Sequence, residues 1–520
     1  MMRRLIPLLL LMAGGAQALS LAWPDGPARG QAYGVLQLLS LGILAACVDR
    51  AATPEKAARD TAIFATAWLA GSTWWLYISL HTYGGMNPVL AAAAVLLLSL
   101  ALSLIYSGFI WLHRQTIAYQ APLLARVAGF AAAWTLAELL RGFIATGFPW
   151  GAIGYAHTDS WLAAWVPWLG VYGVGAIAAA LSMWIGARKV DNIKPSRLSL
   201  YATGAVALAL LALAIQTPAS GTNTDTTLRV ALVQGNVPQN LKFSEDAKAA
   251  LMDYHSAMLH TPADLVVTPE TAVPYLPEQI PAAFWKPLRD TSSHAVLMGL
   301  PLRAKPHGPA AYTNSVLGIA PAQTEDYRYD KHHLVPFGEF VPPLFQWFVD
   351  RMHIPLGDFA KGALAQAPFE WKGQRISVNI CFEDLFGEEL AQSFTHPDRA
   401  PTLLLNVSNL AWFGNTVALD QHLNIARMRA MELGRPMLRA TNTGATAVID
   451  AQGQVQHKLD YETKGVLIAD VRGISGPSTP YVRWVAQWGL WPLAGAMCLL
   501  WGIAAQMSRN SRHGQRRFGG

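Results

Sequence analysis

The chain has 520 residues, of which 52% are hydrophobic and 14% are charged. This composition, with a positive mean hydropathy, is too apolar for an ordinary soluble multidomain protein and indicates a membrane protein. The net charge of +6 does not indicate nucleic-acid binding, because much of the excess lies in short stretches between apolar runs and in the C-terminal tail.

Apolar segments fill the first part of the chain and recur once near its end. A bilayer core needs about 20 apolar residues in helical form, and segments approaching that length predict eight membrane spans. Residues 1–217 are therefore expected to form a membrane domain of about seven helices, and the more polar residues 218–482 a soluble domain. A final helix and a basic tail over residues 507–520 follow. The predicted spans are residues 5–23, 33–48, 61–80, 88–112, 123–144, 161–187, 199–217 and 483–506.

The placement of Lys and Arg predicts the orientation of these spans. When the loops are assigned alternately to the two sides, one side receives nearly all of the basic residues, and the short loops of the other hold Arg29 and little else. By the positive-inside rule both termini are cytoplasmic, and the soluble domain lies on the far side of the membrane. The first segment has an alternative interpretation, because MMRR, an apolar stretch and AGGAQA resemble a cleavable signal peptide. Cleavage would leave seven spans and the same placement of the domain.

Two charged residues interrupt the fifth predicted span. Glu138 and Arg141 stand three residues apart and can share a helix face. A charge inside the membrane favours a functional role, but an ion pair that packs the helix end fits the sequence at least as well. The following loop, GFPWGAIGYAHTDSW, is expected at the outer interface, either lining a lipid entrance or forming an aromatic belt.

The soluble segment alternates short β-rich runs with helical ones. Predicted strands are RVALVQGN, DLVVTPE, HAVLMGL, RISVNI, TLLLNVS and TAVID, and predicted helices are SEDAKAALMDYHSAML and VALDQHLNIARMRAMEL. This alternation indicates a layered α/β domain of about 245 residues.

Three chemically competent residues stand where predicted strands end, the usual place for reactive groups in α/β folds. They are Glu270, Lys331 and Cys381. Taken singly, a Glu or Lys at a strand end is usually a solvated surface charge, and a Cys is usually a small buried hydrophobic residue.

The soluble segment has one cysteine, because Cys47 and Cys498 lie in apolar runs. It can therefore form no internal disulfide.

The order and flanking sequences of these three residues resemble the Glu-Lys-Cys triad of the nitrilase superfamily. The resemblance covers about residues 228–471 and rests on TPETAVP, YDKHHLVPFGEFVP and NICFED. The motifs SNLAWFG and ARMRAMELGRPMLRATNTG, with the flanking spans, narrow it to the bacterial apolipoprotein N-acyltransferases. The resemblance implies a multi-span α-helical bundle in the inner membrane, joined to a periplasmic αββα sandwich.

The same resemblance implies a ping-pong acyl transfer between two lipid-anchored substrates. Cys381 would attack an acyl ester of a membrane phospholipid and hold the chain as a thioester. The α-amine of a diacylated apolipoprotein's N-terminal cysteine would then accept it. No metal, dissociable cofactor or nucleic acid is implied, since the adjacent His332 and His333 lack a convincing third ligand.

The residue types fit this chemistry independently. A thiol that titrates near 8.5 needs a base to become a nucleophile near neutral pH, and Glu270 can take the proton. Lys331 can favour the thiolate and then stabilise the oxyanion, with the backbone N–H of Phe382. By resemblance, Glu339 helps to hold the lysine.

Further residues are assigned to substrate binding by the resemblance. Glu383 matches a functionally important position, although a simple loop carboxylate fits equally well. Phe243 stands where an aromatic residue, often Trp, is expected in an arm over the site, and Leu410 replaces a more usual Asp. An apolar rim, with core packing as the alternative for each member, is predicted from Phe337, Phe340, Trp412 and Phe413.

Three other functions remain open on the sequence alone. A membrane-tethered amidase or nitrile hydrolase would use the same triad with water as acceptor. A transporter with an accessory domain is disfavoured, because the spans show no convincing internal repeat. A lipoprotein-binding module with a dead site is disfavoured because no triad member is missing.

Overall fold

The computed structural model describes residues 2–188, 221–239, 247–290, 292–304, 311–321, 323–341 and 359–518. The chain forms two compact units, each built from separate stretches of sequence. The first, here the helical unit, comprises Met1–Trp74, Ala92–Pro218 and Trp488–Gly520. The second, the sheet unit, comprises Trp75–Ala91 and Ala219–Gln487. The sequence predicts a single boundary between the two domains at residue 217. The structure differs, because Trp75–Ala91 belongs to the sheet unit.

The helical unit contains the apolar helices expected of a membrane bundle. By length and composition, three helical stretches of the described chain can cross a membrane, and the bent pair α14–α15 makes a fourth if it counts as one span. Two further apolar stretches are shorter: Leu5–Leu21 within α1, and Gly34–Asp49, which is α2. The predicted span over residues 199–217 lies outside the described residues. The helices of this unit are α1 (Met2–Leu21), α2 (Gly34–Asp49), α3 (Pro54–Thr73), α5 (Pro88–Thr116), α6 (Leu123–Arg141), α7 (Val166–Arg188) and α15 (Trp491–Phe518). The helix α14 (Pro480–Trp488) belongs to the sheet unit up to Gln487.

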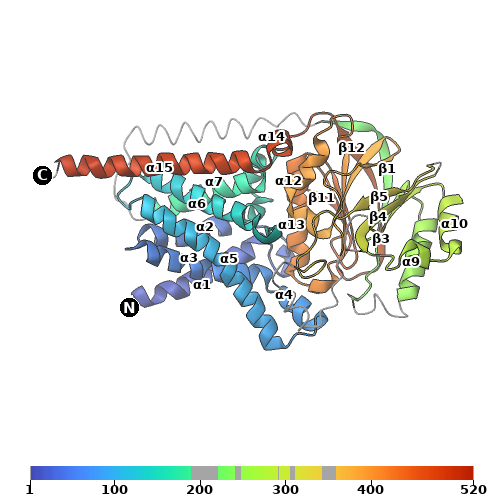
Figure 1. Cartoon of the computed structure of the whole chain (residues 1–520), viewed down its shortest axis with the longest axis horizontal. Helices are drawn as coiled ribbons and strands as arrows, with labels where there is room; N and C mark the ends of the chain where they lie inside the picture. The colour runs from blue at the N-terminus through green and yellow to red at the C-terminus, as the bar shows by residue number, and fades with distance from the viewer. Residues whose placement is uncertain are drawn as a thin grey trace. The chain divides into compact units, whose positions relative to one another are not determined.

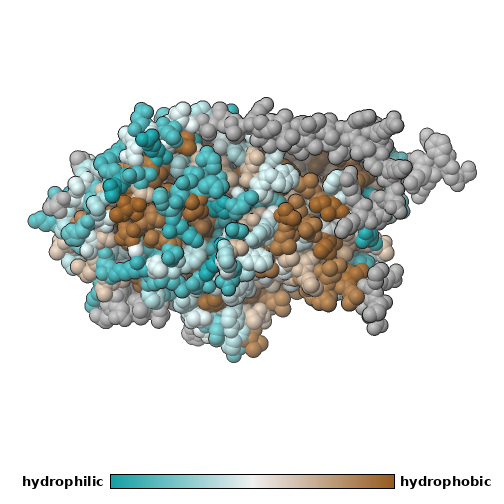
Figure 2. Space-filling model, turned by 180° about the vertical axis from the view of Figure 1, so that it is seen from behind, coloured by the Kyte–Doolittle hydropathy of each residue, from teal (hydrophilic) through white to brown (hydrophobic). Residues whose placement is uncertain are grey.

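Apolar side chains cover much of the helical unit's surface. Figure 2 shows hydrophobic residues gathered over this unit, whereas hydrophilic residues predominate on the same face of the sheet unit. Such a surface would be unstable in water and is typical of contact with lipid. The exposed residues include Leu8, Met12, Leu97, Leu104, Leu499 and Ile503.

Two predicted spans differ from the helices of the structure. The third is predicted over residues 61–80, but α3 ends at Thr73, and Trp75–Ala91 belongs to the sheet unit. The same helix begins ahead of the predicted span, at Pro54, where Thr53 accepts a hydrogen bond from the backbone of Lys56 and caps it. The last was placed over residues 483–506 as one helix, but α14 and α15 meet at an angle of 95°. Gly489 has φ 57° at this bend, a conformation that glycine adopts without strain.

Glu138 and Arg141 are bound to the loop that follows them. Arg141 Nη1 donates to the carbonyls of Phe148 and Trp150, both at 2.6 Å. Glu138 Oε1 accepts from the backbone N–H of Ile153 at 2.9 Å. The two charges therefore shape the predicted interfacial loop, and we assign them no catalytic role.

The sheet unit is an αββα sandwich, as predicted. It has two six-stranded sheets, ordered β12-β1-β2-β3-β4-β5 and β11-β10-β9-β8-β7-β6. Figure 1 shows α9 (Ala247–His260) and α10 (Ala282–Asp290) on one side of the sheets, and α12 (Gly387–Leu390) and α13 (Val417–Leu433) on the other. The strands are β1 (Thr222–Gln234), β2 (Leu265–Val267), β3 (Ala295–Arg303), β4 (Tyr312–Ile319), β5 (Tyr327–Asp330), β6 (Phe369–Trp371), β7 (Gln374–Ile380), β8 (Leu403–Ser408), β9 (Met437–Thr441), β10 (Ala447–Ile449), β11 (Val455–Lys458) and β12 (Gly465–Ser475).

The central strands explain the continuous apolar runs of the sequence. Strands β1, β2 and β3 pair in parallel, as do β7, β8 and β9. They are covered on both faces, so nearly every residue of β2 and β8 is buried. The core between the sheets includes Leu232, Val267, Leu297, Ile380, Leu405 and Leu438.

Candidate active site

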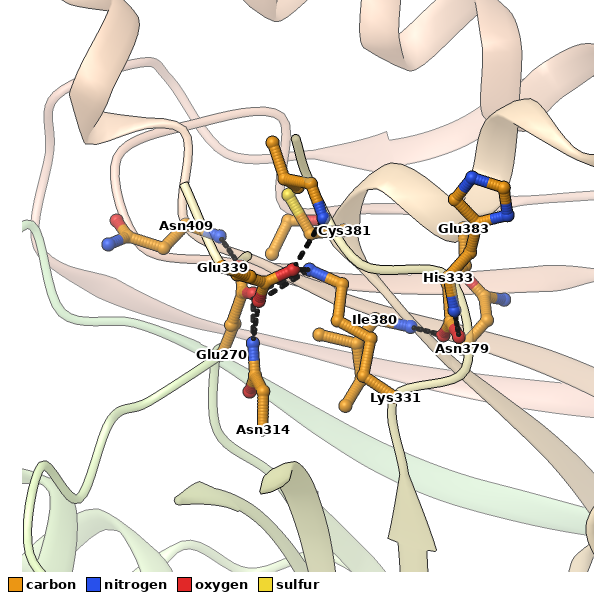
Figure 3. A network of polar contacts seen from close by, with 12 residues as sticks. Glu270, Asn314, Lys331, His333, Glu339, Asn379, Ile380, Cys381, Glu383 and Asn409 are labelled. Atoms are coloured by element: carbon orange, nitrogen blue, oxygen red, sulfur yellow. Dashed lines mark hydrogen bonds and ion pairs between the residues drawn. The ribbon is translucent and has the colours of Figure 1, made fainter. Parts of the chain in front are cut away.

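Three strand ends bring Glu270, Lys331 and Cys381 into one cluster. Glu270 follows β2, Lys331 follows β5, and Cys381 follows β7 directly. Nζ of Lys331 lies 3.3 Å from Oε1 of Glu270. Figure 3 shows the side chains of all three residues converging. Glu270 and Cys381 are more than a hundred residues apart in the sequence. Because β2 and β5 belong to one sheet and β7 to the other, the packing of the two sheets assembles the cluster.

Lys331 is held between two carboxylates. Its Nζ lies 2.9 Å from Oε2 of Glu339, in addition to its contact with Glu270. Asn314 on β4 donates from Nδ2 to Glu270 at 2.8 Å and to Glu339 at 2.7 Å. Burial alone would lower the pKa of Lys331, but Glu339 and Glu270 outweigh it, and the net pKa is raised. The ammonium therefore stays charged at neutral pH.

The backbone around Glu270 is closely packed. Its Oε2 accepts from the backbone N–H of Asn409 at 2.8 Å. A Cβ on Gly299 of β3 would lie 2.3 Å from the carbonyl oxygen of Pro269 and 2.9 Å from Cα of Glu270. A glycine is therefore required where β3 passes beneath the glutamate.

Cys381 opens a tight turn in a strained conformation. It begins the 3-10 turn η8 (Cys381–Leu385) with φ 53°, which costs a non-glycine residue about 1–3 kcal/mol. Burial raises the pKa of its thiol, and the charge of Glu270 raises it further against the opposing effect of Lys331. The resting thiol is therefore protonated at neutral pH and needs a base to react.

Glu383 ties the lysine loop to the cysteine turn. Its Oε1 accepts from the backbone N–H groups of His332 and His333 at 2.6 and 3.1 Å. Its Oε2 accepts from Ile380 N at 2.6 Å and from the hydroxyl of Tyr329 at 2.8 Å. Burial raises the pKa of Glu383 to about 7, and the backbone donors limit the rise. These bonds favour a positioning role over direct substrate contact.

The predicted rim residues fall into two loops. Phe337 is 36% exposed and Phe340 half-buried, in the turn that carries Glu339. Trp412 is 37% exposed and Phe413 half-buried, in the turn η10 (Ala411–Phe413). Phe382 is buried beside Cys381. Phe243 lies outside the described residues.

The η10 turn contacts Trp75–Ala91, the N-terminal stretch that belongs to the sheet unit. The Trp75 ring lies 4.3 Å from that of Phe413, and its Nε1 donates to Gln421 at 3.2 Å. Ser79 Oγ donates to the carbonyl of Trp412 at 2.8 Å. Leu410, which immediately precedes the turn, is fully buried. This departure from the family motif thus supplies core packing.

Several residues of the site were not predicted from the sequence. Asn314 lies on a strand that the sequence patterns did not reveal, and no signal singled it out. Asn409 stands within SNLAWFG, a motif whose resemblance to the family assigns no role to this residue. In the described ranges, no group of three or more His, Cys, Asp or Glu residues could hold a metal ion.

Comparisons with known proteins cover both units. Residues 229–474 match the carbon-nitrogen hydrolase family, and residues 15–184 match the apolipoprotein N-acyltransferase N-terminal domain. The chain is 48% identical to an apolipoprotein N-acyltransferase of Verminephrobacter eiseniae, over 96% of this chain and 97% of that one. It is 46% identical to one of Ralstonia nicotianae, over 92% and 90%. It is 36% identical to one of Azotobacter vinelandii, over 97% and 96%.

Proposed function

Because the chain belongs to the apolipoprotein N-acyltransferase family, and is an acyltransferase that N-acylates lipoproteins, we propose that Cys381 carries the acyl chain as a thioester. The donor is a membrane phospholipid, and the acceptor is the α-amine of a diacylated apolipoprotein's N-terminal cysteine. The observation that carries this proposal is the buried contact of Lys331 with Glu270 and Glu339, beside the only cysteine of the sheet unit.

The first half-reaction forms the thioester. Glu270 takes the proton of the Cys381 thiol, and the thiolate attacks the ester carbonyl of the phospholipid. The charged Nζ of Lys331 and the backbone N–H of Phe382 stabilise the oxyanion. Removal of one such donor typically costs about 10²–10³ in rate. The intermediate then collapses, the ester C–O bond breaks, and Glu270 returns its proton to the departing lysophospholipid.

The second half-reaction forms the amide. The α-amine of the apolipoprotein attacks the thioester carbonyl, and Glu270 removes a proton from the nitrogen as the new C–N bond forms. The same two donors stabilise the second oxyanion. The C–S bond breaks, and Glu270 returns its proton to the Cys381 thiolate, which restores the starting state. Glu339 neither gains nor loses a proton in this scheme, and it keeps Lys331 in place and charged.

The proposed location follows from the lipid substrates and the charge pattern. The protein spans the bacterial inner membrane with both termini in the cytoplasm, and the sheet unit faces the periplasm. The proposed membrane domain covers residues 1–217 and the catalytic domain residues 218–482, to which Trp75–Ala91 adds a structural part. Confinement of both substrates to one membrane raises their effective concentration at the site.

The proposed contacts with the acyl chains come from the two rim loops. Phe337 and Trp412 expose more than a third of their surface, which suits contact with an apolar ligand. Phe340 and Phe413 are half-buried in the same two loops and would complete the rim. The ring of Phe382 is buried, so we propose that this residue contacts the substrate through its backbone N–H.

One assay tests the proposed function. Purified protein is incubated with an acyl-labelled phospholipid, first alone and then with a diacylated lipopeptide. The label should accumulate on Cys381, be released by neutral hydroxylamine as thioesters are, and move to the lipopeptide amine on its addition. Cys381→Ala should fold normally and do neither. Release of free fatty acid at one rate, with or without lipopeptide, would instead identify a hydrolase that uses water as acceptor.

A further inference from the structure

Three fully buried polar residues form a chain that ends on the backbone of Cys381. Asp384 lies in the η8 turn, Arg439 on β9 and His422 on α13. Oδ2 of Asp384 accepts from Nη1 of Arg439 at 2.8 Å, and Nη2 of Arg439 lies 2.7 Å from Nδ1 of His422. Nε2 of His422 lies 3.3 Å from the carbonyl oxygen of Cys381. Burying an ion pair such as Asp384–Arg439 often adds little to the stability of a protein. We therefore look for a role of this pair in the reaction, because it lies close to the nucleophile.

The arginine fixes the protonation of the histidine. A guanidinium group can only donate, so Nδ1 of His422 must accept and carries no proton. The neutral ring then has its proton on Nε2, which donates to the carbonyl of Cys381. Burial and the charge of Arg439 hold the pKa of His422 well below its usual value, so the ring stays neutral. His422 is therefore oriented as a donor to the Cys381 backbone, and it does not serve as the base for the thiol.

The carbonyl of Cys381 and the N–H of Phe382 belong to the same planar peptide. Any donor that fixes this carbonyl therefore also fixes the direction of the N–H at the other end. Asn406 adds a second donor, from Nδ2 to the same oxygen at 3.2 Å. Hydrogen bonds to a carbonyl also polarise the peptide and strengthen its N–H as a donor. Cys381 has a positive φ, a strained backbone conformation that persists only where surrounding contacts hold it. Hydrogen bonds to its carbonyl are contacts of this kind.

We propose that Asp384, Arg439 and His422 position and polarise the Cys381–Phe382 peptide, so that its N–H is aimed at the oxyanion. The inference rests on the proposed function, in which this N–H is an oxyanion donor. The three residues do not touch substrate and are positioning residues. Arg439 orders the ring of His422, and Asp384 balances the charge of Arg439 inside the protein.

Substitutions at His422 separate this role from a general structural one. His422→Phe keeps an aromatic ring and removes the donor. His422→Gln keeps an N–H near the position of Nε2, whereas the shorter His422→Asn cannot reach the Cys381 carbonyl. The rate of thioester formation is measured in a single turnover over a range of phospholipid concentrations. Alkylation of Cys381 by iodoacetamide is followed on its own peptide, because that displacement needs the thiolate but no oxyanion donor.

His422→Phe should slow thioester formation at saturating phospholipid by about 10- to 100-fold, less than the cost of losing a whole oxyanion donor. The phospholipid concentration that gives half-maximal rate, and the alkylation rate, should stay unchanged. His422→Gln should restore most of the loading rate. If His422→Phe does not fold, the contrast between a competent Gln variant and an impaired Asn variant tests the same point.

Two results would overturn the inference while leaving the proposed function intact. One is thioester formation at the wild-type rate in His422→Phe or, should that variant not fold, in His422→Asn. The other is a parallel fall in loading and alkylation, which would place the effect on the thiol itself. Failure of the wild-type protein to form any Cys381 thioester would instead reject the proposed function.

Discussion

Oε2 of Glu339 lies 2.9 Å from Nζ of Lys331, on the same loop and eight residues further along the chain. This carboxylate supplies much of the charge that keeps the buried lysine protonated, which leaves Glu270 available for proton transfer. Glu339→Gln preserves the size of the side chain and removes its charge. We expect it to slow thioester formation by about 10-fold or more, because the oxyanion loses a well-oriented cation.

The matched control for this change is Glu278→Gln. Glu278 forms an exposed ion pair with Arg303 in the same unit, and exposed pairs contribute little. The control should leave both the melting temperature and acyl transfer unchanged. Equal activity in Glu339→Gln and the wild type would argue against a supporting role for Glu339.

The thiol of Cys381 should react slowly with alkylating agents in the absence of substrate. Its pKa is raised by burial and by Glu270, so the neutral thiol predominates at pH 7 and the thiolate forms only as the pH rises further. Iodoacetamide labelling of the Cys381 peptide should therefore be slower than that of a small free thiol and should increase steadily above pH 8. Faster labelling than the free thiol at pH 7 would show that the resting residue is already a thiolate.

Glu383 should matter for stability as well as for activity. Glu383→Ala leaves four donors without their acceptor, and each buried unpaired group costs about 1–3 kcal/mol. We expect a clear drop in melting temperature together with loss of acyl transfer. Denaturation followed by fluorescence or calorimetry checks this. Loss of activity at unchanged stability would favour direct contact with substrate instead.

The membrane topology can be tested with reporter fusions. The distribution of Lys and Arg places a reporter after residue 220 in the periplasm and one after residue 510 in the cytoplasm. Alkaline phosphatase is active only in the periplasm and should be active at the first position alone. Activity at both positions, or at neither, would be incompatible with a final helix that crosses the membrane.

The sequence was most informative where a pattern is local. The helix over Val417–Leu433 was predicted to the residue, and the strands that end near Glu270 and Cys381 follow from the short β-rich runs DLVVTPE and RISVNI. By contrast, β4 was missed, and with it Asn314, because the polar residues within YTNSV weaken the apolar pattern of a strand.

Features that depend on tertiary packing could not be predicted. His422 lies on the predicted helix, but its contact with the Cys381 carbonyl depends on how α13 packs on the second sheet. The bend at Gly489 could not be predicted either, because an isolated glycine inside an apolar run is also compatible with a continuous helix.

The contribution of Trp75–Ala91 to the sheet unit has a consequence for engineering and for evolution. The carbon-nitrogen hydrolase match begins at residue 229, so a chimera designed on that boundary would take Phe413 and Gln421 from one parent and Trp75 from the other. Recombination between distant relatives is then expected to succeed more often when the crossover carries both stretches together. A gene fragment that encodes residues 219–487 alone lacks the Trp75–Ala91 part of the sheet unit.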